Sequence, residues 1–262
     1  MRKLLILLIL ALPLQAAEKR KDLTFLSVDR IFPHIAAGGV WSSTIILMNL
    51  DDVEAETTML FFKPDGSPWV VTDSEGGTYS ALTITLGGLG MIVIELPSNG
   101  PDVETGWAQI DQPDNATIGG QLIFRDNGGP GRPIPFEAVV PLTDFVEGSE
   151  NLDENFWIHH VPFDQRAGFN TCLAIANPTN AAIELGIVAV DLTEGVLEEA
   201  TTSIMFAVGN QRAFCLSTEM PELAGRRGYL TLARPAGTAL AVLGLRFDPL
   251  GAFTTFFSMS AL

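Results

Sequence analysis

The sequence predicts an all-β protein built from two successive β-rich domains. Short apolar segments rich in Val, Ile, Thr and Phe recur about every ten residues and end at Gly, Pro, Asn or Asp, which is typical of β-sandwiches and barrels. After the N-terminal segment, no stretch shows a convincing helical repeat. The chain also repeats itself, because the pattern of residues 40–63 returns at residues 168–191.

The N-terminal segment reads as a targeting signal. Arg2 and Lys3 precede an apolar run from Leu4 to Leu14, and small residues surround Ala16. A membrane-spanning helix needs about 20 apolar residues, so this shorter run predicts a cleaved secretory signal peptide over residues 1–16. We therefore expect an exported protein that is secreted, periplasmic or at the cell surface, with no integral membrane span.

The first domain is predicted over residues 23–145. Its alternating segments are separated by turn residues such as Pro64-Asp65-Gly66, where Pro fixes φ and Gly accepts a positive φ. We expect strands near residues 23–32, 41–49, 56–63, 68–72, 80–86, 91–96, 106–111, 117–125 and 135–141.

Residues 146–154 are acidic and poor in apolar side chains, so they predict a linker. The second domain follows over residues 155–262 in the same pattern. We expect strands near residues 155–162, 169–177, 182–191, 199–207, 211–217, 227–234, 239–247 and 252–259.

The two domains match in pattern, order and nearly constant spacing, although few residues are identical, and this predicts that one arose by duplication of the other. A constant offset of 128 pairs Trp41 with Phe169 and Asn49 with Asn177. Further along, an offset of 122 pairs Trp107 with Tyr229 and Asp126 with Asp248. We expect both domains to have the same strand order.

Each copy has seven or more short strands in about 110 residues, and in this it resembles the tandem immunoglobulin-like or fibronectin-type β-sandwich proteins of bacterial secretomes. The resemblance rests on pattern, order and spacing. It implies two immunoglobulin-like β-sandwich domains related by internal duplication, and it implies no catalytic residue. The Cys…Trp…Cys spacing of antibody domains is absent.

The charge balance excludes nucleic acid as an expected partner. The chain has 31 acidic and 15 basic residues, for a net charge of −16, and five of the basic residues lie in the first 22 positions. The negative electrostatic field of such a chain repels phosphate backbones and anionic lipids.

We interpret the acidity as a solubility feature; the alternative is calcium or cationic-ligand binding. The acidic loops at residues 51–56 and 150–154 lack the order of a recognised calcium loop, so we predict no metal and no cofactor.

No catalytic motif is present. The chain has three His and contains no HExxH and no GxSxG. His159 and His160 are adjacent in a predicted strand, so their side chains should point to opposite faces. Gly87, Gly88 and Gly90 lie between two predicted strands and indicate a hairpin turn. We therefore predict a non-catalytic module for adhesion, surface structure or macromolecular binding, with an extracellular polymer or surface protein as its partner.

Trp69 and Trp157 are the candidate ligand-facing aromatics. Trp41 and Trp107 are replaced by aromatic residues in the second copy, which indicates a packing role. A carbohydrate-binding protein is the alternative function, and an unrecognised extracellular hydrolase is a third.

Cys172 and Cys215 are the only cysteines. They fall on strands that are neighbours in an immunoglobulin-like sheet, and an exported protein meets an oxidising compartment. A disulfide and two half-buried free thiols remain equal alternatives.

The C-terminal segment from Ala252 to Ser260 is rich in aromatic residues. Phe253, Phe256 and Phe257 make it a candidate docking edge, where an added strand pairs with unpaired backbone groups. The alternative is a final strand that buries its aromatics in the second core.

Overall fold

The computed structural model describes residues 28–128, 135–144, 156–257 and 259–260, and it confirms the prediction of an all-β chain. The first half contains the strands β1 (Val28–Ala37), β2 (Trp41–Asn49), β3 (Ala55–Phe62), β4 (Val71–Thr72), β5 (Thr78–Tyr79), β6 (Ala81–Leu86), β7 (Met91–Leu96), β8 (Glu104–Asp111), β9 (Ile118–Asp126), β10 (Phe136–Pro141) and β11 (Thr143–Asp144). The second half contains β12 (Phe156–Asp164), β13 (Asn170–Ala176), β14 (Ile183–Asp191), β15 (Gly195–Phe206), β16 (Gln211–Cys215), β17 (Arg227–Pro235), β18 (Ala241–Phe247), β19 (Phe253–Phe257) and β20 (Met259–Ser260).

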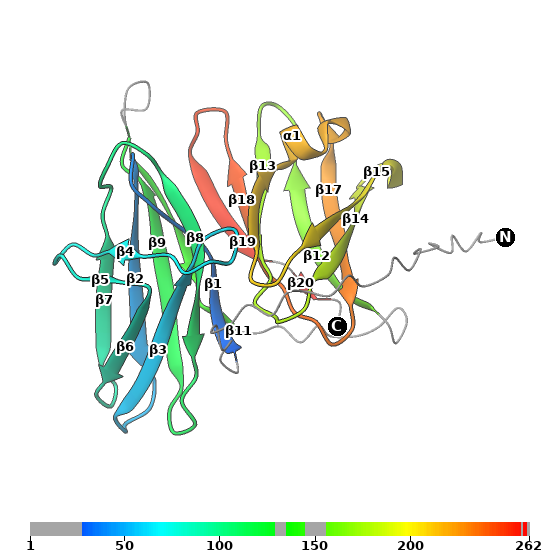
Figure 1. Cartoon of the computed structure of the whole chain (residues 1–262). Helices are drawn as coiled ribbons and strands as arrows, with labels where there is room; N and C mark the ends of the chain where they lie inside the picture. The colour runs from blue at the N-terminus through cyan, green and yellow to red at the C-terminus, as the bar shows by residue number, and fades with distance from the viewer. Residues whose placement is uncertain (1–27, 129–134, 145–155, 258, 261–262) are drawn as a thin grey trace.

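Each half contains a pair of packed antiparallel sheets, and the first half also contains the two-stranded sheet β4-β5. In the first half a five-stranded sheet, β11-β1-β8-β3-β6, faces a four-stranded sheet, β10-β9-β2-β7. In the second half the five-stranded sheet is β20-β12-β17-β14-β15 and the four-stranded sheet is β19-β18-β13-β16. The strand order is therefore the same in both halves, which lie side by side in Figure 1.

The alternation of apolar residues explains why these segments are strands. In β2, Ile45 and Leu47 are buried while Met48 faces outward, and in β14 every second residue from Ile183 to Asp191 is buried. One face of each sheet thereby enters the core between the sheets, because successive strand residues point to opposite faces.

Asn49 and Asn177 perform the same task in the two halves. Each side-chain amide donates to three backbone carbonyls, those of Val53, Leu86 and Gly87 in the first half and those of Ala181, Phe206 and Ala207 in the second. Each side-chain oxygen accepts the N–H two residues further on. The identical residue satisfies buried backbone groups that would otherwise lack partners.

Gly106 and Gly228 are also equivalent. A Cβ at Gly106 would lie 2.2 Å from the Phe62 carbonyl oxygen, and one at Gly228 would lie 1.9 Å from the Val190 carbonyl oxygen. In both halves, therefore, only glycine fits where strand β8 or β17 passes its neighbour.

Short helical segments interrupt the second half, contrary to the expectation that the chain has no helix. They are α1 (Leu216–Glu219) and the 3-10 turn η1 (Pro221–Leu223), and their Leu216 and Leu223 side chains are buried. Strand β1 also runs five residues beyond its predicted end, to Ala37, while predicted residues 23–27 lie outside the described residues.

The two halves share an interface whose residues are buried, except for Pro64, which is exposed and contributes its backbone carbonyl. We call its first-half residues the seat (Ile31, His34, Pro64, Trp107 and Phe124) and its second-half residues the docking face (Ala176, Gly209, Gln211 and Phe253). Ile31 and Trp107 cluster with Ala176, and the Trp107 indole donates to the Gly209 carbonyl at 3.0 Å.

Polar and aromatic contacts complete this interface. The Gln211 amide nitrogen lies 2.9 Å from His34 Nδ1, and its backbone N–H donates to the Pro64 carbonyl at 2.9 Å. The Phe253 ring packs 5.4 Å from the Phe124 ring and 5.6 Å from the Trp41 ring, measured between centroids. The contact is thus a packed surface, and it fixes the halves against each other.

Candidate binding groove in the second half

A groove of about 710 Å³ lies on the second half. It lies where β12, β17, β18 and β19 approach one another, beside the outer face of the five-stranded sheet. Its lining includes His160, Pro162, Leu192, Tyr229, Arg246 and Phe256. The volume is in the range that holds a ligand or an inserted side-chain cluster.

An aromatic pair forms one wall of the groove. The His160 and Tyr229 rings meet edge to face at 5.1 Å between centroids, and the Thr231 hydroxyl lies 3.3 Å from His160 Nδ1. The two residues come from adjacent strands, β12 and β17, and both point away from the core because Val161 and Leu230 beside them point inward. The wall therefore offers ring surface to a partner.

A guanidinium group forms the opposite end. Arg246 lies over the Phe169 ring at 3.8 Å, and its Nη2 is 3.3 Å from Asp164 Oδ2. Asp164 also pairs with Arg166 at 2.9 Å, and the hydrogen bond from Arg166 lowers the pKa of the Asp164 carboxyl. Asp164 is therefore held as a carboxylate, and the groove combines apolar surface with fixed charge.

The adjacent histidines point to opposite faces of β12. His160 lies in the groove, while His159 is buried, and burial lowers the pKa of His159 to about 4. Within the described ranges, no group of three or more His, Cys, Asp or Glu side chains is placed to hold a metal ion.

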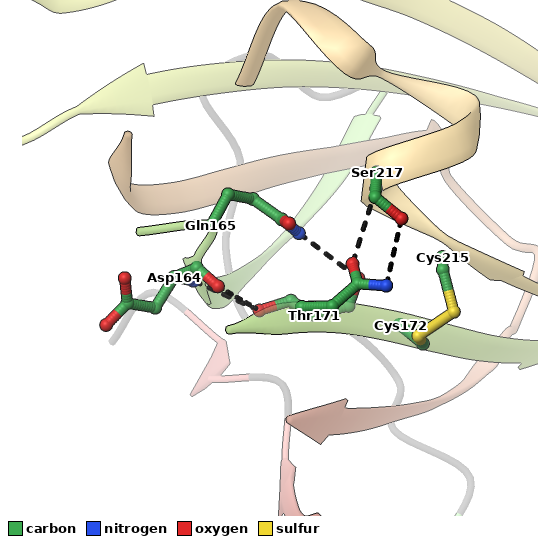
Figure 2. The surroundings of a disulfide bond; sticks show 7 residues. Asp164, Gln165, Thr171, Cys172, Cys215 and Ser217 are labelled. Atoms are coloured by element: carbon green, nitrogen blue, oxygen red, sulfur yellow. Dashed lines mark hydrogen bonds between the residues drawn. A yellow bond between two sulfur atoms is a disulfide. The ribbon is translucent and has the colours of Figure 1, made fainter. Parts of the chain in front are cut away.

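A disulfide joins Cys172 and Cys215. The two residues are directly opposed on the neighbouring strands β13 and β16 (Figure 2). Around it, Asn170 exchanges hydrogen bonds with Ser217, and the Thr171 hydroxyl accepts the N–H of Asp164 at 3.0 Å. The bond and these contacts hold β13, which borders the groove through Thr171.

Of the two tryptophans expected to face a ligand, Trp69 is only 2 % exposed. It packs into the first core and donates from Nε1 to Glu104 at 3.2 Å, so its ring is closed to stacking. It borders a smaller hollow of about 340 Å³. Trp157 lies in β12 opposite Arg234, but its side chain is outside the described residues.

The aromatic C-terminal strand β19 does not form an open docking edge at Phe253. That side chain is buried against Trp41 and Phe124 of the first half, and the Thr255 hydroxyl donates to the Val139 carbonyl of β10. Phe256 is half-buried in the groove, and the Phe257 side chain is outside the described residues. The first half thus occupies this side of β19.

Of the residues that line the groove, only Phe256 was among the sequence candidates. Tyr229 matches Trp107 in the repeat, and this match was interpreted as a shared packing role. The two positions differ in what covers them: the second half covers Trp107, whereas Tyr229 lines the open groove.

No family model, no curated protein and no solved structure matches this chain. In the parts of the chain that the structure describes, no helix has the length and apolar character needed to cross a bilayer.

Proposed function

We propose that this chain is an exported, non-catalytic binding module made of two tandem immunoglobulin-like β-sandwich domains, residues 23–145 and 155–262, that arose by duplication. The equal strand order and the repeated roles of Asn49 with Asn177 and Gly106 with Gly228 support the duplication. The signal-like N-terminus supports export. The partner is a surface protein or an extracellular polymer.

The observation that carries the proposal is the groove on the second half. In the first half the equivalent surface, the seat, is filled by another sandwich domain through rings, small side chains and hydrogen bonds. The groove offers the same kind of surface uncovered: the aromatic wall of Tyr229 and His160, the exposed Leu192 and the guanidinium of Arg246. Apolar and aromatic side chains with a few placed polar groups are what binding sites need.

Carbohydrate binding is the second candidate. The observation that favours it is the aromatic wall beside Arg246, since sugars pack against rings and accept hydrogen bonds from guanidinium groups. A glycan panel distinguishes the two: saturable binding of a defined glycan that is lost in Tyr229→Ala supports the second candidate over a protein partner.

The direct test is binding of the purified mature protein to isolated cell envelopes of the producing cells. Leu192→Glu places a charge on the groove wall at a side chain that is 62 % exposed, so the fold is preserved. We expect at least about a tenfold loss of affinity, because a buried unpaired carboxylate costs several kcal/mol.

Val70→Glu is the matched control, since Val70 is 58 % exposed and lies beside the smaller hollow of the first half, whereas the groove is lined by second-half residues. Equal binding by wild type and Leu192→Glu contradicts the proposal. Reproducible turnover in a glycosidase, esterase and protease screen, abolished by one substitution, contradicts the non-catalytic assignment.

A further inference from the structure

The groove occupies the position in the second half that the seat occupies in the first. The strand registers fix the correspondence: Gln109 pairs with Ile31 in the first half as Thr231 pairs with His160 in the second, and Gly106 and Gly228 mark the same point on β8 and β17. The registers match Ile31 with His160, and they match the bulged pair Pro33 and His34 with Pro162. The repeat offsets match Pro64 with Leu192, Trp107 with Tyr229 and Phe124 with Arg246, and all five of these second-half residues line the groove.

The docking face also has a counterpart, on the outer face of the first half's four-stranded sheet. Met48 in β2 pairs with Met91 in β7, just as Ala176 in β13 pairs with Gln211 in β16. Met48 therefore corresponds to Ala176, and Met91 corresponds to Gln211. The same registers place Leu89 at the position of Gly209 and Glu137 at that of Phe253. These positions are open: Met91 is 60 % exposed and Leu89 is 69 % exposed. The molecule thus presents an unfilled seat at one end and an unused docking face at the other.

Some residues of the internal interface are replaced by different residues in the groove and on the outer face of the first half. Where this happens, both residues of a contacting pair are replaced together. Inside the molecule the large Trp107 meets Gly209. At the unfilled surfaces the smaller Tyr229 corresponds to Trp107, and the larger Leu89 corresponds to Gly209. Leu89 has a φ of 56°, which is unfavourable for a leucine, as Gly209 has a φ of 71°. Leu89 therefore presents an exposed apolar side chain at the turn where Gly209 presents none.

Two further pairs change together. The hydrogen-bonded pair of Gln211 and His34 corresponds to Met91 and Pro162, so a polar contact becomes an apolar one. The ring pair of Phe253 and Phe124 corresponds to Glu137 and Arg246, which carry opposite charges. Glu137 and Arg246 are both partly exposed, and each has an ion pair within the chain, to Arg125 and Asp164. In each pair the two surfaces remain chemically complementary.

We propose that the partner of the groove is a second copy of this chain, bound head to tail. The outer face around Met48, Leu89, Met91 and Glu137 of one copy occupies the groove of the next and repeats the internal interface. The inference rests on the proposed function of the groove and names its occupant. Since the two surfaces differ, the contact is heterologous, and it propagates as a filament or closes as a ring.

Analytical ultracentrifugation of the full mature chain over a range of concentrations tests this. The wild type should show a weight-average mass that rises beyond that of a dimer, and Val70→Glu should behave in the same way. Met91→Glu disables the docking face and Leu192→Glu disables the groove, and both changed side chains are as exposed as Val70. Each variant alone should be monomeric, with circular dichroism matching the wild type.

The mixture of the two variants is decisive. Met91→Glu keeps its groove and Leu192→Glu keeps its docking face, so an equimolar mixture should form a one-to-one dimer and nothing larger. A wild type that is monomeric at every concentration overturns the inference, as does a mixture that stays monomeric. Envelopes from cells that lack this protein separate the two proposals: if a monomeric wild type still binds them through Leu192, the groove's binding function stands and only the self-association fails.

Discussion

At the scale of single residues, His34 makes the stability of the fold depend on pH. It is buried in the interface between the halves, its Nδ1 lies 2.9 Å from the Gln211 amide nitrogen, and its ring packs edge to face on Phe124 at 5.5 Å. Burial lowers the pKa of His34 to about 4, from an ordinary value of 6.5. Only the neutral ring accepts the hydrogen bond that the Gln211 amide donates, so protonation breaks this contact.

This shift predicts loss of stability in acid. Between pH 6.5 and about 4 the unfolded chain binds a proton at His34 that the folded chain does not, so the free energy of unfolding falls as the pH falls. The full effect below pH 4 is about 3 kcal/mol. In urea unfolding at pH 7 and pH 4, His34→Gln should lose less stability than the wild type between the two pH values. Burial also lowers the pKa of His159, so the free energy of unfolding of the His34→Gln variant should still fall to some extent as the pH falls. An unchanged pH dependence in His34→Gln contradicts this account.

At the scale of elements, the disulfide between Cys172 and Cys215 is the covalent link between β13 and β16. The equivalent positions in the first half are Thr44 and Glu95, which are paired across β2 and β7 without a bond, so the fold itself does not need the link. A disulfide limits the unfolded chain, and its removal typically costs about 2–4 kcal/mol. We expect Cys172→Ala with Cys215→Ala to lose stability of this size in denaturant unfolding.

Reduction provides the control for that experiment. Dithiothreitol should lower the stability of the wild type by a similar amount and leave the double variant unchanged, which separates the bond from the altered side chains. Two reactive thiols in the unfolded, unreduced protein would show that the link does not form.

Strands were the most predictable elements. Alternation and turn residues place β2, β3, β7 and β14 within one residue of their observed bounds, because one buried face per sheet fixes the period of two. The helical turn α1 has only four residues and no side-chain cap, so it leaves no periodic signal. The burial of Trp69 was also beyond prediction, since the turn at Gly66 brings Pro68 back to pair with Phe62 and places Trp69 over the core.

At the scale of the whole molecule, the repeat predicts the strand order of each half but not how the halves meet. Trp107 and Tyr229 occupy equivalent positions in matching strands, yet one is fully buried by the other half and the other lines an open groove. The local sequence pattern around Trp107 is the same as that around Tyr229. The difference arises only from which surface the neighbouring domain covers, and this depends on contacts more than a hundred residues apart in sequence, such as that of Trp107 with Gly209.

The central claim is that the groove of the second half is the binding surface of this protein. Hydrogen–deuterium exchange on the mature chain, free and bound to cell envelopes, tests it most directly. The account predicts slower exchange on binding in β12 and β17 and in the turn that contains Leu192, with no change around Val70 beside the smaller hollow. Protection confined to the surroundings of Val70, with β12, β17 and Leu192 exchanging as in the free protein, would contradict it.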